Sequence, residues 1–320
     1  MARNIKKYLS IGVKGMAMGA ADVVPGVSGG TIAFITGIYD ELLSTIDNLN
    51  FGILKTWKKE GFKKMFITYN LGFLVSLFLG VFVSIVSLAK LISYLLENHP
   101  ILVWSFFFGL VLASIIYVGK QIEKWNILAF VAILLGAAVA YYITIASPSV
   151  APDEWYYYLF SGAIAIIAMI LPGISGSFIL VLLGSYSIVL GALTNFVEAL
   201  LAGNWELVKT NFVKVFTFIL GCIIGLKLFS KVLKWMFANK KNLTLAVLTG
   251  FMIGSLNKIW PWKQVLTTRV DRHGVEVPLL ENSISPFSFD GDPKLVLAIV
   301  LAVFGFGLIL LMEKLAVKNK

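Results

Sequence analysis

Two short motifs rich in glycine and serine carry the residues best suited to bind an anion. The first spans residues 24–30 and is written VPGVSGG; the second spans residues 171–177 and is written LPGISGS. Proline lacks a backbone N–H and glycine relaxes the chain, so each motif should interrupt a helix and start a new one with free N–H groups. Those groups, and the positive end of the helix dipole, favour a phosphate or a carboxylate. The residues predicted to break the helices are Pro25, Gly26, Pro172 and Gly173.

Hydroxyl groups and glycines of the two motifs are the candidate ligands of a phosphate group. Hydroxyls donate hydrogen bonds, and glycines let a ligand approach the backbone closely. The motif residues assigned to phosphate binding are Ser28, Gly29, Gly30, Thr31, Ser175, Gly176 and Ser177. For a single motif, a tight helix–helix turn with a serine cap is the simpler explanation. The recurrence of the motif favours a binding site.

Three lysines inside apolar segments could assist with an anionic headgroup. They are Lys90, Lys227 and Lys231. Lys90 and Lys231 occupy matching places, and in the inverted repeats Lys90 is predicted near the outer side of the membrane and Lys231 near the inner side. Snorkelling, in which a long side chain reaches the membrane interface, explains these two equally well. Lys227 is more deeply placed and has Val86 as its counterpart, so any role it has is asymmetric.

Two acidic residues are candidates for ion coupling. Asp22 precedes the first Pro-Gly pair, and an ionisable residue at membrane depth is a functional hypothesis by default. It could take up H⁺ or Na⁺, or contact a lysine; its counterpart in the second motif is Met169. Glu41 is the second candidate, and simple hydration at the interface is its alternative explanation. We expect no cofactor beyond a coupling ion, and no metal site, because both histidines fall in predicted outer loops.

The elements that position these residues must be membrane helices. Of the 320 residues, 58% are hydrophobic and 14% charged, whereas a soluble domain carries about 25% charged residues. This composition excludes an ordinary soluble enzyme. A spanning helix needs roughly 20 apolar residues, and the apolar segments are continuous rather than alternating, as strands of a membrane barrel would be. We therefore predict an all-α polytopic membrane protein.

The apolar segments fall into two similar halves. The first repeat, residues 1–147, holds a re-entrant helical hairpin at 8–47 and spans at 66–96, 101–118 and 126–146. The second repeat, residues 148–320, holds a hairpin at 155–195, spans at 211–237, 243–260 and 295–312, and an outer loop at 261–294. Each half crosses the membrane an odd number of times. The two repeats therefore have inverted topology, a recurring plan in secondary transporters.

Matching residues of the two halves lie at three offsets. The offset is 147 in the hairpins, 141 in the next two spans and 169 in the last span, so an insertion of 28 residues falls in the outer loop. These offsets are read from Pro25 and Pro172, Gly109 and Gly250, and Gly136 and Gly305. Chance similarity between apolar helices is the alternative. It does not explain the shared Pro-Gly-x-Ser-Gly pattern.

The distribution of charge predicts that both termini are cytoplasmic. The predicted inner segments hold 18 of the 27 basic residues, and the outer loops hold five basic residues and 10 of the 17 acids. This is the asymmetry of the positive-inside rule, and it accounts for the net charge of +10 without nucleic acid. The basic N-terminus precedes no compact apolar core with a small-residue cleavage site, so we expect no signal peptide.

The motif residues resemble those of a known family. The run ADVVPGVSGGT at residues 21–31, with its second copy LPGISG at 171–176, is similar to the bacterial polyprenyl-phosphate transporters called PopT. The likeness extends over essentially the whole chain, including the helix of Lys90. It implies transport of undecaprenyl phosphate, the lipid carrier of cell-envelope synthesis, across the bacterial plasma (inner) membrane. The implied partners are the lipid phosphate and membrane lipids; the oligomeric state stays open.

Three functional hypotheses follow. The first is a flippase for the lipid phosphate, working by ion-coupled alternating access with the headgroup at the two motifs. The second is a transporter or channel for a small water-soluble anion, which the same motifs would serve. The third, a membrane enzyme such as a lipid phosphatase, needs a nucleophile with a base or a set of metal ligands. Two histidines and the single cysteine Cys222 do not form such a set, so we expect no enzyme.

Overall fold

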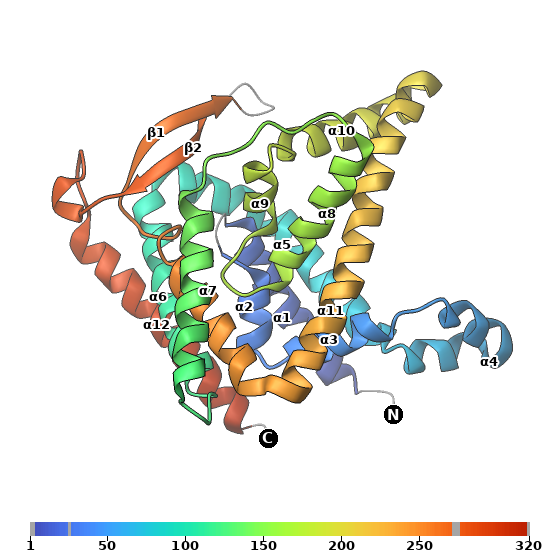
Figure 1. Ribbon diagram of the computed structural model, residues 1–320, viewed down its shortest axis with the longest axis horizontal. Coiled ribbons are helices and arrows are strands. Elements are labelled where there is room, and N and C mark those ends of the chain that lie inside the picture. The colour runs from blue at the N-terminus through green and yellow to red at the C-terminus, as the bar shows by residue number, and fades with distance from the viewer. Residues whose placement is uncertain (1–3, 25–26, 271–275, 319–320) are drawn as a thin grey trace.

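A computed structural model describes residues 4–24, 27–270 and 276–318 of the protein. Helices form almost all of its elements, and one β-hairpin lies between the last two helices (Figure 1). The helices are α1 Ile5–Val23, α2 Gly29–Ile35, α3 Tyr39–Asn48, α4 Gly52–Thr68, α5 Leu71–Asn98, α6 Pro100–Gly119, α7 Ile127–Ile145, α8 Trp155–Ile170, α9 Gly176–Leu182, α10 Tyr186–Ala202, α11 Trp205–Ser255 and α12 Leu295–Lys318. The antiparallel strands are β1 Lys263–Val270 and β2 Glu276–Ser283, followed by a 3₁₀ turn at Pro286–Ser288.

Five of the described helices are long and apolar enough to cross a membrane, namely α5, α6, α7, α11 and α12. α11 is counted once in this set although it has 51 residues. The backbone of Lys240 is not helical (φ −138°, ψ 42°) and bends α11 into two arms. The sequence predicts two separate spans here, at 211–237 and 243–260, and the structure joins them through this kink without a loop. The chain is a polytopic helical membrane protein.

Two broken helical hairpins lie among these spans. α1 begins on the side of the molecule where α12 ends, which we call the termini side, and α2 returns toward it (Figure 1). α8 begins on the opposite side, which carries β1 and β2 and which we call the strand side, and α9 returns there (Figure 1). α9 and α10 meet at a bend of 107°. The inner ends of α1 and α8 therefore approach the middle of the molecule from opposite sides.

Glycines set the closest contacts between the hairpins and the spans. A Cβ atom at Gly15 of α1 would lie 2.2 Å from the carbonyl oxygen of Leu77 in α5. A Cβ atom at Gly162 of α8 would lie 2.3 Å from the carbonyl oxygen of Phe218 in α11. The two glycines are 147 residues apart and the two carbonyl residues 141 apart. The same contact thus occurs in both halves of the chain, at the offsets read from the sequence.

A second pair of glycine contacts interlocks the two halves. α6 packs against α12, and α7 packs against α11. A Cβ atom at Gly109 would lie 1.8 Å from the carbonyl oxygen of Ala302, and one at Gly250 would lie 2.3 Å from that of Ile133. These partners follow the offsets of 141 and 169. Each contact joins an element of the first half to one of the second, so the halves share a common helix bundle.

The outer loop predicted at 261–294 contains two β-strands and a 3₁₀ turn, which its hydropathy does not indicate. β1 and β2 pair over most of their length as an antiparallel hairpin. Its base is fixed by two tryptophans, because the indole of Trp260 donates to the carbonyl of Ile284 (2.8 Å) and that of Trp262 donates to the carbonyl of Pro293 (2.9 Å). Trp262 also packs with Ile101 of α6. The hairpin therefore covers the strand side of the bundle.

The span predicted at 66–96 begins later, at Leu71, and the residues before it belong to α4. Asn70 adopts a left-handed conformation (φ 50°) that separates the two helices. The apolar residues at the end of α4 adjoin the span in sequence, so hydropathy alone did not separate them. α4 extends away from the bundle on the termini side (Figure 1). It carries the exposed lysines Lys55, Lys58, Lys59, Lys63 and Lys64.

Candidate functional site

The two broken hairpins touch at the middle of the molecule, and Ser28 makes the central contact. Ser28 is 1% exposed and precedes the first residue of α2. Its hydroxyl accepts a hydrogen bond from the N–H of Gly30 (3.1 Å). The same hydroxyl lies within donating distance of the carbonyls of Met169 (3.2 Å) and Leu171 (3.1 Å) at the end of α8. The start of α2 therefore packs against the last turn of α8.

Other residues of the first hairpin complete this contact. The N–H of Gly173 donates to the hydroxyl of Thr31 (3.2 Å). The phenol of Tyr39 donates to the carbonyl of Ile170 (3.1 Å). A Cβ atom at Gly30 would lie 2.5 Å from that same carbonyl oxygen, so only glycine fits there without displacement. The first hairpin thus satisfies the carbonyl groups that the C-terminus of α8 would otherwise leave unpaired.

Asp22 already supplies a carboxylate to the start of α2. Its Oδ1 atom accepts a hydrogen bond from the N–H of Gly29 at 2.7 Å. A carboxylate at a helix N-terminus satisfies a free N–H and interacts favourably with the helix dipole. Ser28, Gly29, Gly30 and Thr31 are therefore engaged by other groups of the chain in this structure. Pro25 and Gly26, which are predicted to break the helix, lie outside the described residues.

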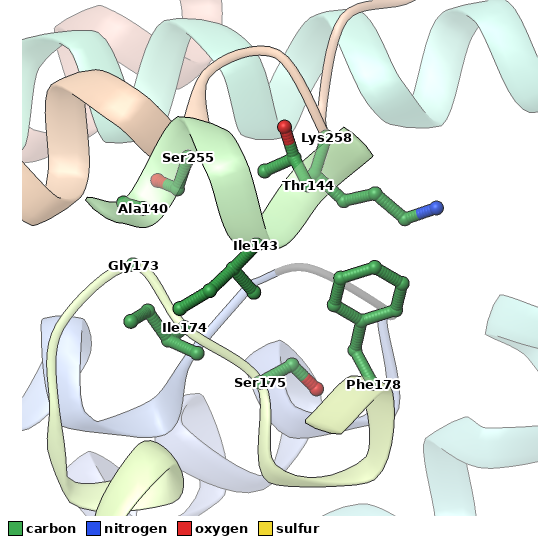
Figure 2. Close-up of a pocket in the computed structure, with 9 residues that line it drawn as sticks. All are labelled: Ala140, Ile143, Thr144, Gly173, Ile174, Ser175, Phe178, Ser255 and Lys258. Carbon is green, nitrogen blue, oxygen red and sulfur yellow. The ribbon is translucent and has the colours of Figure 1, made fainter. Parts of the chain in front are cut away.

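The second hairpin leaves a cavity beside its break. The hydroxyls of Ser175 and Ser177 lie 2.9 Å apart, and Gly173 turns the chain with a positive φ of 88°. Next to them is a small pocket, partly open to the surface, with room for about one water molecule. Figure 2 shows its lining, in which the Lys258 side chain extends over the Phe178 ring. The lining residues are Ala140, Ile143, Thr144, Gly173, Ile174, Ser175, Phe178, Ser255 and Lys258.

The groups around this cavity suit an anion. Lys258 contributes an ammonium group, and Ser175 a hydroxyl, from opposite walls. Gly176 follows at the start of α9, in the position that Gly29 has in α2. Met169 stands where the first hairpin has Asp22, 147 residues earlier. The start of α9 is therefore not capped by a carboxylate at that position.

The structure does not bring the predicted lysines to the cavity. Lys90 and Lys231 are exposed on the outer faces of α5 and α11. Lys227 is half-buried, and its ammonium group donates to the carbonyls of Ile46 (2.9 Å) and Asp47 (2.7 Å) at the end of α3. A cation there complements the negative end of the α3 dipole. Lys227 therefore fastens α3 to α11.

Glu41 also lies away from the hairpin tips. It belongs to the first turn of α3, and its Oε1 atom accepts a hydrogen bond from the side-chain amide of Asn70 at 2.7 Å. Asn70 separates α4 from α5, so this contact ties α3 to the base of a span. Within the described ranges, no group of three His, Cys, Asp or Glu side chains gathers as a metal site would require.

Lys258 and Phe178 are the site residues that sequence reasoning missed. In sequence, Lys258 lies near the end of the predicted span 243–260, where an interfacial lysine is expected. Phe178 is one of many apolar residues in its segment. Their connection depends on the return of α9 toward the end of α11. One signal was available, because Lys258 corresponds at offset 141 to Tyr117, so the two halves differ in charge at this place.

These features define a class of protein. A helical membrane protein in which two broken hairpins meet beside a small pocket with a lysine in its wall has the architecture of a membrane transporter. The chain belongs to the family described as VCA0040-like and undecaprenyl phosphate translocase-like, whose model matches residues 18–277.

Two curated relatives carry the same name. The chain is 48% identical over 322 residues to the polyprenyl-phosphate transporter of Vibrio cholerae serotype O1 (strain ATCC 39315 / El Tor Inaba N16961), covering 99% of this chain and 100% of that one. It is 30% identical over 267 residues to the polyprenyl-phosphate transporter of Staphylococcus aureus (strain NCTC 8325 / PS 47), covering 80% and 87% of the two chains. No solved structure matches the chain.

Proposed function

We propose that this protein carries a polyprenyl phosphate, and specifically undecaprenyl phosphate, across the bacterial plasma membrane. The names of the family and of both curated relatives support this substrate class. The direction we propose is from the outer to the inner leaflet, which recycles the lipid carrier for cell-envelope synthesis. The protein acts as a transporter and not as an enzyme.

The observation that carries the proposal is the cavity at the second hairpin. A phosphate group needs hydrogen-bond donors and a positive charge, and it needs them where water is scarce. Ser175, Ser177 and Lys258 bring two hydroxyls and an ammonium group to the break in the helix. Non-helical backbone at membrane depth is tolerated where it lines such a cavity. We assign the phosphate headgroup to this pocket, which must widen to admit it, and the polyprenyl tail to the lipid-facing surface of the bundle.

We further infer that the halves are inverted copies that work by alternating access. The paired glycine contacts of the two halves support the repeat. The counterparts of the pocket residues in the first half are fully packed: Val27, Ser28 and Thr31 are each 1% exposed and Ile309 is 0% exposed. The second hairpin is packed almost as closely, with Ile174 6% and Ser175 7% exposed, and it leaves a small pocket beside its break. Widening of this pocket, and of its counterpart at the first hairpin in a second state, would present the headgroup to each leaflet in turn.

The distribution of charge supports an orientation with the termini side in the cytoplasm. The lysine-rich helix α4 lies on that side, next to the starting end of α1 (Figure 1). Lysines next to membrane helices favour the cytoplasmic face. We propose that Asp22 couples transport to H⁺ or Na⁺, because its carboxylate caps the start of α2, next to the serine that contacts the second hairpin. Replacement of Asp22 by Asn should then leave equilibrium exchange intact and abolish transport driven by an ion gradient.

Reconstitution into liposomes tests the function. A short-chain fluorescent polyprenyl phosphate is placed in both leaflets, and the fraction accessible to an external quencher is followed with time. We expect headgroup-dependent flipping that falls about tenfold or more in Ser175→Ala and Lys258→Met, since each tenfold corresponds to about 1.4 kcal/mol. Lys209→Met, at an exposed lysine of α11, is the matched control.

Two outcomes would contradict the proposal. Equal flipping of the phosphate and of the uncharged polyprenol by the wild-type protein would remove the headgroup from the mechanism. Uptake of inorganic phosphate without flipping of the lipid would identify a transporter or channel for a small soluble anion instead.

A further inference from the structure

Three charged side chains form a buried cluster between the cavity and the β-hairpin. Lys258 follows α11, Lys263 begins β1, and Glu281 lies in β2. One carboxylate oxygen of Glu281 lies 3.3 Å from the ammonium group of Lys258 and 3.5 Å from that of Lys263. The exposed fractions of these side chains are 15% for Lys258, 7% for Lys263 and 18% for Glu281. A single oxygen atom therefore bridges two lysines out of contact with most of the solvent.

The charges of this cluster do not balance. Two ammonium groups face one carboxylate, which leaves an excess positive charge in a place where an uncompensated charge is unfavourable. Burial lowers the pKa of Lys263 to about 8, and Glu281 only partly opposes this effect. Although burial alone would raise the pKa of Glu281, the two lysines hold it below its usual value. A dianion would neutralise the pair, and a carboxylate does not.

Aromatic rings position both lysines independently of Glu281. The Lys263 ammonium group lies 3.8 Å from the ring centroid of Trp104 in α6. The Lys258 ammonium group lies 4.6 Å from the ring centroid of Phe178 in α9. Such cation–π contacts are strongest where the cation is removed from water. The lysines would therefore keep their places if the carboxylate moved away.

Glu281 belongs to a small sheet whose pairing is irregular beside it. β1 and β2 form a sheet of only two strands, and such a hairpin has little stability of its own. The pairing is irregular next to Glu281, because the register shifts between Val265, which pairs with Glu281, and Thr267. The base of the hairpin is held by Trp260 and Trp262. Glu281 lies three residues before Ile284, close to this attached base, so its carboxylate leaves the lysines by rotation of the side chain while the backbone stays in place.

We propose that Lys258 and Lys263 form a binding site for a phosphomonoester dianion, and that Glu281 occupies it as an exchangeable counter-ion until the lipid phosphate arrives. A phosphomonoester carries close to two negative charges at neutral pH, which matches the two lysines. Lys258 also lines the cavity at the second hairpin, so the site leads directly to the break in the helix. This inference rests on the proposed function and extends it, since it assigns the first headgroup contact on the strand side.

Binding measurements on the full-length protein in lipid nanodiscs test the assignment. The probes are farnesyl phosphate as a short lipid phosphate, farnesol as its uncharged analogue and inorganic phosphate. We expect Lys258→Met and Lys263→Met each to weaken farnesyl phosphate binding at least tenfold, and Lys209→Met to leave it unchanged. We expect Glu281→Gln to tighten binding several-fold, because it removes the competing charge and retains the shape of the side chain.

The Glu281→Gln variant separates a counter-ion from a structural ion pair. If Glu281 only stabilises the hairpin, its replacement would weaken binding and lower the melting temperature of the ligand-free protein, and the proposal would be overturned. Wild-type affinity in both lysine variants would overturn it as well, even where the wild-type protein flips lipid. Failure of the wild-type protein to bind farnesyl phosphate would instead count against the proposed function. Equally tight binding of inorganic phosphate would contradict the assignment to a lipid headgroup.

Discussion

The tips of the two helical hairpins have the same sequence pattern and different chemical surroundings. At the first tip, the carboxylate of Asp22 accepts the N–H of Gly29, and Ser28 is buried against the end of α8. At the second tip, Met169 and Gly176 occupy the corresponding positions, 147 residues later. There the adjoining space is a cavity with a lysine in its wall.

This difference shows how a repeat can hold a single ligand. If both tips were uncapped, they would attract the same anion equally. If both carried a carboxylate, they would repel it equally. In this structure the first tip is neutralised from within the chain and acts as a packing surface. The second tip keeps its hydroxyls beside a cationic cavity. The asymmetry therefore resides in the residues that flank the motif and not in the motif itself.

The largest effect is expected from the difference in packing between the two tips. We expect Gly30→Ala to destabilise the protein by about 1–3 kcal/mol, as overpacking of a close contact does, because the added Cβ atom would meet the carbonyl oxygen of Ile170. Its counterpart Ser177 already carries a Cβ atom and is exposed, so Ser177→Ala should change stability by under about 0.5 kcal/mol. Thermal unfolding in detergent measures both. Equal melting temperatures for the two variants would show that the tips do not differ in packing.

The second prediction transfers the carboxylate of the first tip to the second. Met169→Asp places an acid where Asp22 stands in the first half, next to Gly176 in place of Gly29. We expect this acid to cap α9, repel the phosphate and weaken lipid phosphate binding about tenfold, equivalent to about 1.4 kcal/mol. Met169→Asn adds a neutral cap of the same shape and should have little effect. Unchanged affinity in the aspartate variant would mean that the phosphate does not approach the start of α9.

The third prediction concerns pH and the strand side of the cavity. The pKa of Lys263 is lowered to about 8, chiefly by burial, with Lys258 and Glu281 as its charged neighbours. Lys263 is charged below this value and becomes neutral above it. Lipid phosphate binding should therefore weaken as the pH rises from 7 to 9. In Lys263→Arg, whose guanidinium keeps its charge at these pH values, the loss should disappear. A decline of the same size in this variant would assign the titration to another group.

Folding stability should change with pH in the opposite sense. The pKa of Lys263 is about 8 in the folded protein and 10.5 in its usual surroundings. Between these values the unfolded chain binds more protons, so the contribution of Lys263 to stability rises as the pH increases. A binding affinity that falls while stability rises is a pattern that general unfolding at alkaline pH would not produce.

The sequence predicted the helical class and drew attention to both tips, because these properties depend on local patterns. Apolar length indicates a span, and a Pro-Gly-x-Ser-Gly motif indicates a broken helix. It did not predict the β-hairpin at 263–283, whose strands are short and polar, and it did not assign Lys258 to the cavity. Contacts between α9, α11 and β2 depend on how distant elements pack, and hydropathy contains no information on that.

The hydrogen-bond partner of a charged residue indicates its role better than its charge does. Lys227 is a candidate because it is a lysine within an apolar helix, and its ammonium group caps the C-terminus of α3. Asp22 is a candidate by the same reasoning, and its carboxylate accepts the N–H of Gly29 within the first tip. Both are ionisable groups at membrane depth, yet one fastens two helices and the other caps the start of α2. Only the three-dimensional arrangement distinguishes them.

The smallest effect is expected at the two symmetric lysines outside the tips. Lys90 and Lys231 are exposed on the outer surfaces of α5 and α11, where a long side chain can reach the interface without contacting the cavity. We expect Lys90→Met and Lys231→Met to change the flipping rate by less than about twofold, since exposed substitutions usually alter free energies by under about 0.5 kcal/mol. Flipping in liposomes, with Lys258→Met beside them, provides the measurement. A tenfold loss in either variant would mean that the headgroup travels along the outer face of that helix, and that the contrast between the tips does not define its path.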